Sequence, residues 1–197
     1  MIITISGDPG SGKSTVALTL GFRAGYPRVN AGGILREWSK DPTRNPKQLS
    51  FQKWYAQLNP ETDFEADEEL KKAAQSKDHI ILEGRMAFHW APHGKPSLKV
   101  FLSINPEIAG QRVYEQKKRD VKIRKEETSY ESAKEAQEDL EKRKQTEIER
   151  YEKLYGINPY DLKHYDLVID TSYQTPEEVV QQILTAAGVD KGASTPF

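Results

Sequence analysis

Ile2-Ile3-Thr4-Ile5-Ser6-Gly7-Asp8-Pro9-Gly10-Ser11-Gly12-Lys13-Ser14-Thr15 is the stretch of the chain that decides the fold. Residues 7–14 satisfy every position of the phosphate-loop pattern G-x-x-x-x-G-K-[ST]. A short apolar run of β type precedes the loop, and a helix-compatible pattern with apolar residues at Val16, Leu20 and Ala24 follows it. This context of strand, loop and helix predicts a binding site for a nucleoside triphosphate rather than a coincidental glycine-rich turn.

Each residue type in this loop has a chemical task. Glycines allow backbone N–H groups to turn inward around phosphate oxygens, and the N-terminal end of the following helix adds positive potential. We expect Lys13 to act as the catalytic cation that bridges the β and γ phosphates, and Ser14 to offer its hydroxyl to magnesium. The predicted ATP-binding residues are Gly7, Asp8, Pro9, Gly10, Ser11, Gly12, Lys13, Ser14 and Thr15.

The composition of this 197-residue chain, with 36% apolar residues, favours one α/β core with small appendages. A formal net charge of −1 provides no overall attraction to nucleic acid or to membranes, so neither is an expected partner. Cysteine is absent, which excludes disulfides and thiolate metal sites. We find no signal-like segment and no run of eighteen apolar residues, and therefore expect a cytoplasmic protein.

Apolar runs suited to buried parallel strands alternate with helical patterns along the chain. The runs cover residues 2–5, 79–82, 98–102 and 166–169, and Val29 marks a fifth, very short strand. The pattern also predicts a last helix that is capped by Thr175, begins at Pro176 and stops at Gly188. This alternation is typical of an α/β fold with a parallel, doubly wound five-stranded sheet flanked by helices.

Two insertions interrupt the alternation. The first, about residues 32–77, contains helical stretches around residues 34–39, 49–58 and 64–75. The second covers residues 115–150, where 22 of 36 residues are charged, and we interpret it as a mobile flap with too few apolar side chains for firm anchoring. We predict a single domain over residues 1–188, followed by a flexible tail over residues 189–197.

Arginines at two strand ends are candidate ligands of a second phosphate. Phosphoryl transfer requires alignment of donor and acceptor and positive charge around the transferring group, and the planar guanidinium holds phosphate oxygens bidentately. Arg36 follows a segment of small residues after the short second strand. Arg85 follows residues 80–84 at the carboxyl end of a buried strand, where ligands bind in open α/β sheets. We interpret Arg85 as a phosphate clamp, with a salt bridge to a neighbouring carboxylate as the alternative.

Further arginines lie in the charged insertion and before it. Arg143 and Arg150 are seven residues apart and therefore share one helical face. Arg112 and Arg119 have the same spacing and flank the entry to the insertion. The sequence does not decide which of Arg112, Arg119 and Arg124 contacts phosphate.

Two other groups of side chains raise the question of a metal. Glu83 ends a strand that should lie beside the phosphate loop, so it could hold a magnesium-bound water; the alternative is a structural pairing with Arg85 or Lys13. His89 and His93 have the i,i+4 spacing of a zinc pair, but an intervening proline disfavours a helix and no third ligand accompanies them. We expect no metal at the histidines.

Several motifs along the chain are more specific in combination than the phosphate loop alone. They are Ile2 to Thr15, Asn30 to Arg36, Asn59 to Asp63, Leu82 to Arg85, Arg143 to Tyr151, Tyr155 to Ile157 and Tyr165 to Thr171. In this combination the chain resembles the archaeal type of cytidylate kinase, from residue 1 to about residue 187.

The resemblance implies a nucleoside monophosphate kinase of the P-loop class, with a core, a monophosphate-binding insert and a helical LID. It implies transfer of the γ-phosphoryl group of ATP to CMP or dCMP, giving CDP or dCDP, with Mg²⁺. The matching motifs imply that Arg36 and Arg85 bind the acceptor phosphate and that Arg143 and Arg150 close over both phosphates. Asp63 lies in the motif that the resemblance assigns to the acceptor side.

The residues themselves leave other functions open. The rivals are another small kinase of adenylate or shikimate type, and a nucleotide-dependent binding module that signals through the charged insertion. RNA binding by that insertion is disfavoured, because acidic residues interleave with the basic ones and no aromatic surface accompanies them. We expect a monomer that performs in-line transfer without a covalent intermediate, since no nucleophile motif is present. The sequence does not decide between CMP, dCMP and UMP.

Overall fold

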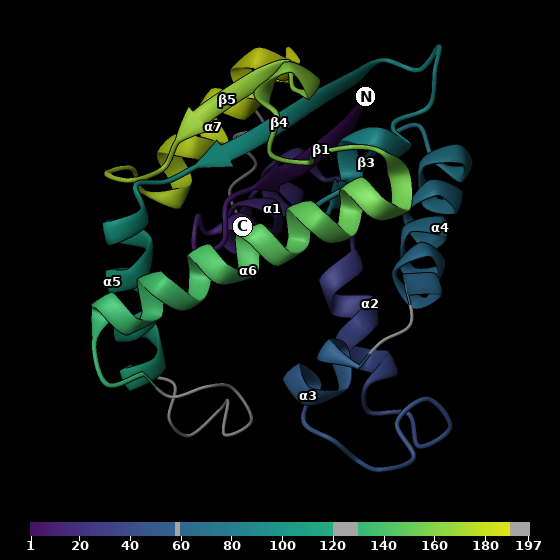
Figure 1. Ribbon diagram of the computed structural model, residues 1–197. Coiled ribbons are helices and arrows are strands. Elements are labelled where there is room, and N and C mark those ends of the chain that lie inside the picture. The colour runs from purple at the N-terminus through teal and green to yellow at the C-terminus, as the bar shows by residue number, and fades with distance from the viewer. Residues whose placement is uncertain (58–59, 120–129, 190–197) are drawn as a thin grey trace.

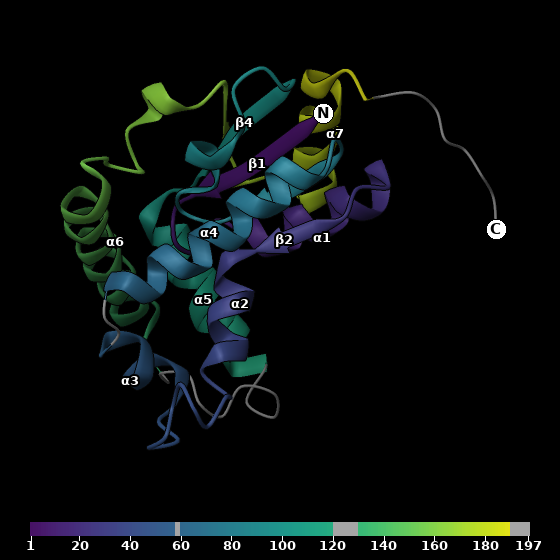
Figure 2. The ribbon, with the colours of Figure 1, turned by 90° about the vertical axis from the view of Figure 1, so that its right-hand side faces the viewer.

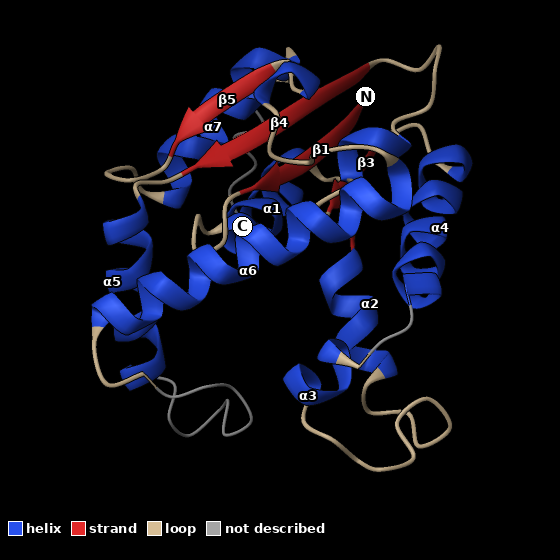
Figure 3. Cartoon of the chain, viewed as in Figure 1, coloured by secondary structure: helices blue, strands red, loops and turns tan. Residues whose placement is uncertain are grey.

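The computed structural model describes residues 1–57, 60–119 and 130–189. They contain a parallel sheet, whose strands are red in Figure 3. The strand order is β2-β3-β1-β4-β5. The strands are β1 (Ile2–Gly7), β2 (Arg28–Asn30), β3 (Ile80–Glu83), β4 (Ser97–Ser103) and β5 (Leu167–Asp170). The predicted five-stranded α/β fold is confirmed, including the short strand at Val29.

Helices connect the strands and fill the two insertions. They are α1 (Lys13–Ala24), α2 (Ala31–Trp38), α3 (Phe51–Ala56), α4 (Pro60–Ser76), α5 (Pro106–Arg119), α6 (Ala133–Tyr155) and α7 (Pro176–Ala187), with short 3-10 turns η1 (Ala87–Trp90) and η2 (Leu162–His164). The last helix has the predicted ends: Thr175 forms a capping box with Glu178, Pro176 occupies the first turn and Gly188 is the left-handed cap.

Two apolar layers cover the faces of the sheet. On one face α1 and α7 pack against the central strands, with Val16, Leu20 and Ile183 in the same cluster as Ile3 and Ile5. On the other face lie α4, η1 and α6, and Figures 1 and 2 show α6 crossing this side of the molecule. Every residue of β1 is buried, so the strand that leads into the phosphate loop is covered on both sides.

Helix α6 corrects our interpretation of the charged insertion. Ala136, Leu140 and Tyr151 are buried on one face of α6, and Leu140 packs with residues of α5. At Gly110 of α5 an added Cβ would lie 2.6 Å from the carbonyl oxygen of Ala133, so glycine permits close approach of the two helices. The expectation of weak anchoring was wrong for residues 133–150, because the few apolar side chains recur at helical spacing. Residues 120–129 of the insertion lie outside the described part.

The first insertion contains a small apolar cluster of its own. Leu35, Trp54 and Ala66 bring α2, α3 and α4 together, and the indole nitrogen of Trp54 donates to the carbonyl oxygen of Arg44 at 2.9 Å. Trp54 is buried and packs within this cluster. Within the described residues, no helix is both long and apolar enough to cross a bilayer. Residues 190–197 of the predicted tail lie outside the described part.

Candidate active site

The phosphate loop joins β1 to α1 at the carboxyl edge of the sheet. Gly7 has a φ of 149°, and an added Cβ there would lie 2.3 Å from the carbonyl oxygen of Leu102, which only glycine avoids. The Lys13 ammonium donates to the carbonyl oxygens of Gly7 and Asp8 at 2.9 and 2.7 Å. The loop therefore holds its lysine close to its own backbone in this state.

Lys13 lies in an environment that disfavours its charge. Its pKa is lowered well below the ordinary value of 10.5, first by burial and then by the nearby Arg85 cation. The carboxylates of Glu147, Glu83 and Asp8 act in the opposite direction but do not compensate fully. A bound polyanion would stabilise the charged lysine, so the loop is suited to phosphate.

Ser14 and Glu83 place a hydroxyl beside a buried carboxylate. The Ser14 hydroxyl donates to Glu83 Oε1 at 2.6 Å, while Oε2 accepts from the side-chain amide of Asn30 at 2.9 Å and lies 3.3 Å from an Arg28 nitrogen. Glu83 therefore does have a structural ion-pair partner, but that partner is Arg28 and not Arg85 or Lys13, as the alternative had it.

This pair of oxygen ligands is suited to magnesium. Mg²⁺ is usually bound through one or two carboxylates together with phosphate oxygens and waters, rather than by an all-protein cage. The described residues contain no group of three or more His, Cys, Asp or Glu side chains positioned to hold a metal. Ser14 and Glu83, next to the phosphate loop, are thus a fitting donor set for a metal that arrives with a nucleotide.

Arg85 reaches from the end of β3 to α6. Its Nε and Nη2 atoms donate to the carboxylate of Glu147, the latter at 3.2 Å, and its Nη1 donates to the carbonyl oxygen of Gly7 at 3.2 Å. The Tyr160 hydroxyl donates to the same carboxylate. The side chains of Arg85 and Glu147 are only 16% and 14% exposed. The salt bridge that we considered as an alternative is present, and it is formed with a residue of the second insertion.

Arg85 and Glu147 each favour the charged form of the other, which opposes the effect of burial on their pKa values. Burial by itself would lower the pKa of Arg85, but the Glu147 carboxylate raises it well above its usual value. Burial would likewise raise the pKa of Glu147, but Arg85 and the Tyr160 hydroxyl hold it below its usual value. The pKa of Tyr160 is raised, mainly by burial, so the phenol stays protonated. The cluster therefore consists of one cation, one anion and one neutral donor.

Arg36 and Arg150 lie against the same pair of aromatic rings in α3. The guanidinium carbon of Arg36 is 5.3 Å from the ring centre of Phe51, and that of Arg150 is 4.8 Å from the ring centre of Tyr55. The two rings are stacked, with centres 5.6 Å apart. Thus the structure brings together two predicted phosphate ligands from α2 and α6. Arg143 is exposed on α6, one turn before Glu147, and helps to lower the pKa of that carboxyl.

The arginines at the entry to the second insertion, Arg112 and Arg119, lie near Thr15 of the phosphate loop. Arg112 donates to the carbonyl oxygens of Thr171 and Ser172 at 2.6 and 2.9 Å. It also lines a cavity of about 480 Å³, together with Thr15 of the phosphate loop and Arg119. Arg119 pairs with Glu115 at 3.7 Å.

Two further candidates fall outside what the structure describes. Arg124 lies in the segment 120–129, and Asp63 belongs to α4 by its backbone while its side chain is not described.

Sequence reasoning missed three polar residues around the loop. The Lys144 ammonium pairs with Asp8 at 2.7 Å, and Glu147 and Tyr160 form the cluster with Arg85. Lys144 and Glu147 are indistinguishable by type from the many other charged residues of α6. Both residues lie on the helical face that carries Leu140 and Tyr151. This spacing is the sequence signal that could have identified them as residues that face the core.

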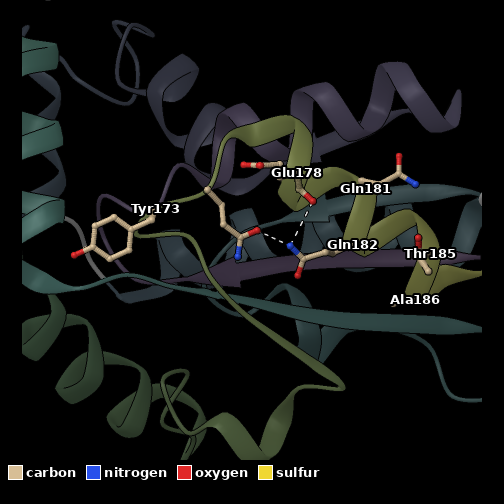
Figure 4. A pocket seen from close by; sticks show the side chains of 7 residues that line it. Tyr173, Glu178, Gln181, Gln182, Thr185 and Ala186 are labelled. Carbon is tan, nitrogen blue, oxygen red and sulfur yellow. Dashed lines mark hydrogen bonds between the residues drawn. The ribbon is translucent and has the colours of Figure 1, made fainter.

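A second cavity, of about 650 Å³, lies against α7 (Figure 4). Gln182 donates from its side chain to Gln174 at 2.5 Å and to the carbonyl oxygen of Glu178 at 3.5 Å. No arginine or lysine of the described chain lines this cavity. Its described lining therefore lacks the cations that a nucleotide phosphate requires.

Comparison with known proteins gives consistent results. The model of a family described as cytidylate kinase-like matches residues 2–173. A cytidylate kinase of Methanopyrus kandleri is 36% identical over 195 residues, which covers 95% of this chain and 92% of that protein. A cytidylate kinase of Pyrococcus abyssi is 36% identical over 181 residues, covering 91% and 89%.

Solved structures resemble the chain in fold. An uncharacterized protein from Eubacterium ventriosum has a TM-score of 0.66 at 18% identity, covering 95% of this chain and 98% of that one. A shikimate kinase from Acinetobacter baumannii, in complex with shikimate, has a TM-score of 0.56 at 16% identity, covering 96% and 94%. At these identities the likeness concerns the fold alone.

Proposed function

The chain belongs to the cytidylate kinase-like family, and from this premise we propose that it transfers the γ-phosphoryl group of ATP to CMP or dCMP, giving CDP or dCDP. One contact carries the proposal: Arg85 Nη1 lies 3.2 Å from the carbonyl oxygen of Gly7. A buried guanidinium at the end of β3 thus adjoins the loop for the triphosphate. Two phosphate groups can meet end to end at this point, as in-line transfer requires.

On the donor side, residues 7–15 hold the triphosphate of ATP, and Lys13 exchanges its backbone carbonyl partners for phosphate oxygens. The cavity lined by Thr15, Arg112 and Arg119 adjoins the loop and is a suitable place for the nucleoside of the donor. Ser14 and Glu83 would hold Mg²⁺, Glu83 through a water. When bound, the ion would neutralise negative charge on the phosphates of ATP.

On the acceptor side, the CMP phosphate is the nucleophile and carries a charge of roughly −1.5 to −2 near neutral pH, as phosphomonoesters do. Arg85 binds it in place of the Glu147 carboxylate, and Arg36 approaches from α2. Arg143 and Arg150 contribute positive charge from α6, which favours the transition state and offsets repulsion between donor and acceptor. Asp63 is proposed on the acceptor side from the matching motif.

The remaining expectations stay predictions. They are a single domain over residues 1–188 with an insert at about 32–77 and a LID at about 115–150, a monomeric state, a cytoplasmic location, and the absence of nucleic acid and membrane partners.

The test is a panel of acceptors. Steady-state rates with CMP, dCMP, UMP, AMP and shikimate are measured at saturating magnesium and ATP, with coupled detection of ADP and chromatographic identification of the product. We expect CDP or dCDP as the main product. Preferred phosphorylation of AMP or shikimate would support the rival kinase classes, and ATP hydrolysis without any phosphorylated acceptor would support the binding module.

A further inference from the structure

We propose that Asp67 selects the base of the acceptor nucleotide by accepting a hydrogen bond from the 4-amino group of cytosine. This inference rests on the proposed function and names a residue that determines its specificity. Asp67 belongs to α4 and is only 4% exposed. Its carboxylate accepts a hydrogen bond from the hydroxyl of Tyr155, at the end of α6, at 2.8 Å. A buried carboxylate of this kind is costly unless it is hydrogen-bonded.

The distance along α6 places Asp67 within reach of a bound nucleotide. Glu147, Tyr151 and Tyr155 follow one another at intervals of four residues and therefore share one helical face. At 1.5 Å per residue, Glu147 and Tyr155 are separated by about 12 Å along the axis. Glu147 marks the proposed acceptor phosphate, because it holds Arg85. A nucleoside monophosphate anchored at Arg85 that extends along this face points its base toward Tyr155 and Asp67.

A second connection through α4 gives the same placement. A Cβ built on Gly84 would lie 3.3 Å from Leu70 Cδ1, so α4 packs directly beside the residue that precedes Arg85. Asp67 lies three residues before Leu70 and is therefore its neighbour on the same helix face. Helix α4 thus brings Asp67 to within about one helical turn of Leu70, which lies beside the end of β3.

The Tyr155 ring, whose hydroxyl donates to Asp67, lies in a cluster of aromatic rings suited to a planar base. The Tyr155 ring stacks against Phe64 and Tyr151 at centre distances of 6.3 and 6.1 Å, and Trp90 and His89 lie 6.1 and 6.2 Å away. Burial lowers the pKa of His89, so the imidazole is neutral near pH 7. Flat rings bind any base by stacking and do not distinguish one from another. Discrimination then has to come from a polar group, and Asp67 provides one.

The chemistry of the carboxylate favours cytosine over uracil. An ionised carboxylate only accepts hydrogen bonds and has about four lone-pair sites, so it can keep the hydrogen bond from Tyr155 and its other contacts and still accept from an amine. Cytosine carries a donating amino group at C4, whereas uracil carries a carbonyl oxygen there. A hydrogen bond to a charged group contributes about 1.5–3 kcal/mol, which corresponds to roughly 10- to 150-fold in kcat/KM.

The first experiment compares three variants for CMP and UMP. Asp67→Asn should lower the ratio of kcat/KM for CMP to that for UMP at least tenfold and leave the KM for ATP unchanged. Glu69→Gln removes a neighbouring charge at an exposed site of α4 and should leave the ratio unchanged. Tyr155→Phe removes the hydroxyl that donates to Asp67. It therefore distinguishes base selection by Asp67 from a purely structural contact between α4 and α6. Equal losses for both substrates in Asp67→Asn, reproduced by Tyr155→Phe, would mean that Asp67 only fastens the two helices.

The second experiment uses the unaltered protein, so it does not depend on how a variant folds. The acceptor is a pyrimidin-2-one ribonucleoside monophosphate, which lacks the 4-amino group of CMP. We expect its kcat/KM to be at least tenfold below that of CMP. Equal values for the two compounds would overturn the role of Asp67 while leaving CMP phosphorylation intact. Failure to form CDP from CMP itself would instead overturn the proposed function.

Discussion

Arg85 and Glu147 form a buried, two-pronged ion pair that fastens the end of β3 to α6. Because Arg85 also donates to the carbonyl oxygen of Gly7, one guanidinium joins the phosphate loop, the sheet and the second insertion. In our proposal the acceptor phosphate replaces Glu147 as the partner of Arg85. Substrate binding then exchanges one anion for another, and the buried arginine is paired at every stage.

Glu147→Gln should destabilise the protein in the absence of nucleotide. Removal of one partner of a buried ion pair leaves an uncompensated charge, which costs about 3–5 kcal/mol. The free energy of unfolding from urea titration measures this loss. Glu149→Gln, at an exposed site two residues along α6, should change it by less than about 0.5 kcal/mol. CMP should restore part of the stability of Glu147→Gln, and equal stability of the two variants would contradict a stabilising, buried ion pair.

Acid should weaken the same ion pair. The folded-state pKa of Glu147 lies below the ordinary value of 4.5, so its contribution to stability is complete above about pH 4.5. The contribution is lost as pH falls through the lowered pKa of the folded state, because the unfolded chain takes up the proton first. The stability difference between the wild type and Glu147→Gln should therefore shrink below pH 4.5. A difference that stays constant down to pH 3 would show that the charge of Glu147 is not involved.

The fold and the phosphate loop could be predicted because their signals are local. The loop is a contiguous motif between an apolar strand and a helix, and the ends of α7 are marked by Thr175, Pro176 and Gly188. The end of β3 placed Arg85 at the edge of the sheet, where ligands bind. Each of these inferences needed only neighbours in the sequence.

The partners across the site could not be predicted in the same way. Glu147 lies 62 residues from Arg85, and Tyr155 lies 88 residues from Asp67. Which carboxylate of α6 meets Arg85 depends on how that helix docks, and docking is set by Ala136, Leu140 and Tyr151 among many charged neighbours. Composition averaged over the insertion hid this face, which is why the prediction of weak anchoring failed.

Lys13→Ala should abolish phosphoryl transfer without unfolding the protein. The pKa of Lys13 is lowered, first by burial, so burial of the charged ammonium is unfavourable in the nucleotide-free state. Removal of the lysine side chain also removes this unfavourable free energy. We expect no measurable CDP formation and a melting temperature that is not lowered by more than a few degrees. Lys72→Ala, at an exposed site on α4, should keep full activity. Substantial transfer by Lys13→Ala would contradict the assigned role of the loop.

Arg143→Ala and Arg150→Ala should lower turnover far more than ATP affinity. Both arginines lie on α6, on either side of Glu147, and Arg150 already faces Tyr55 of α3. Positive charge that acts mainly in the transition state of phosphoryl transfer can contribute about 10³ or more in rate. We therefore expect kcat to fall by roughly that factor. The Kd of a nonhydrolysable ATP analogue should change by less than about threefold, because the arginines do not contribute to ATP binding in the ground state. The control variant Lys142→Ala removes a positive charge next to Arg143 and should keep the turnover of the wild type. If both arginine variants kept the turnover of Lys142→Ala, the charge of α6 would have no part in the transfer step.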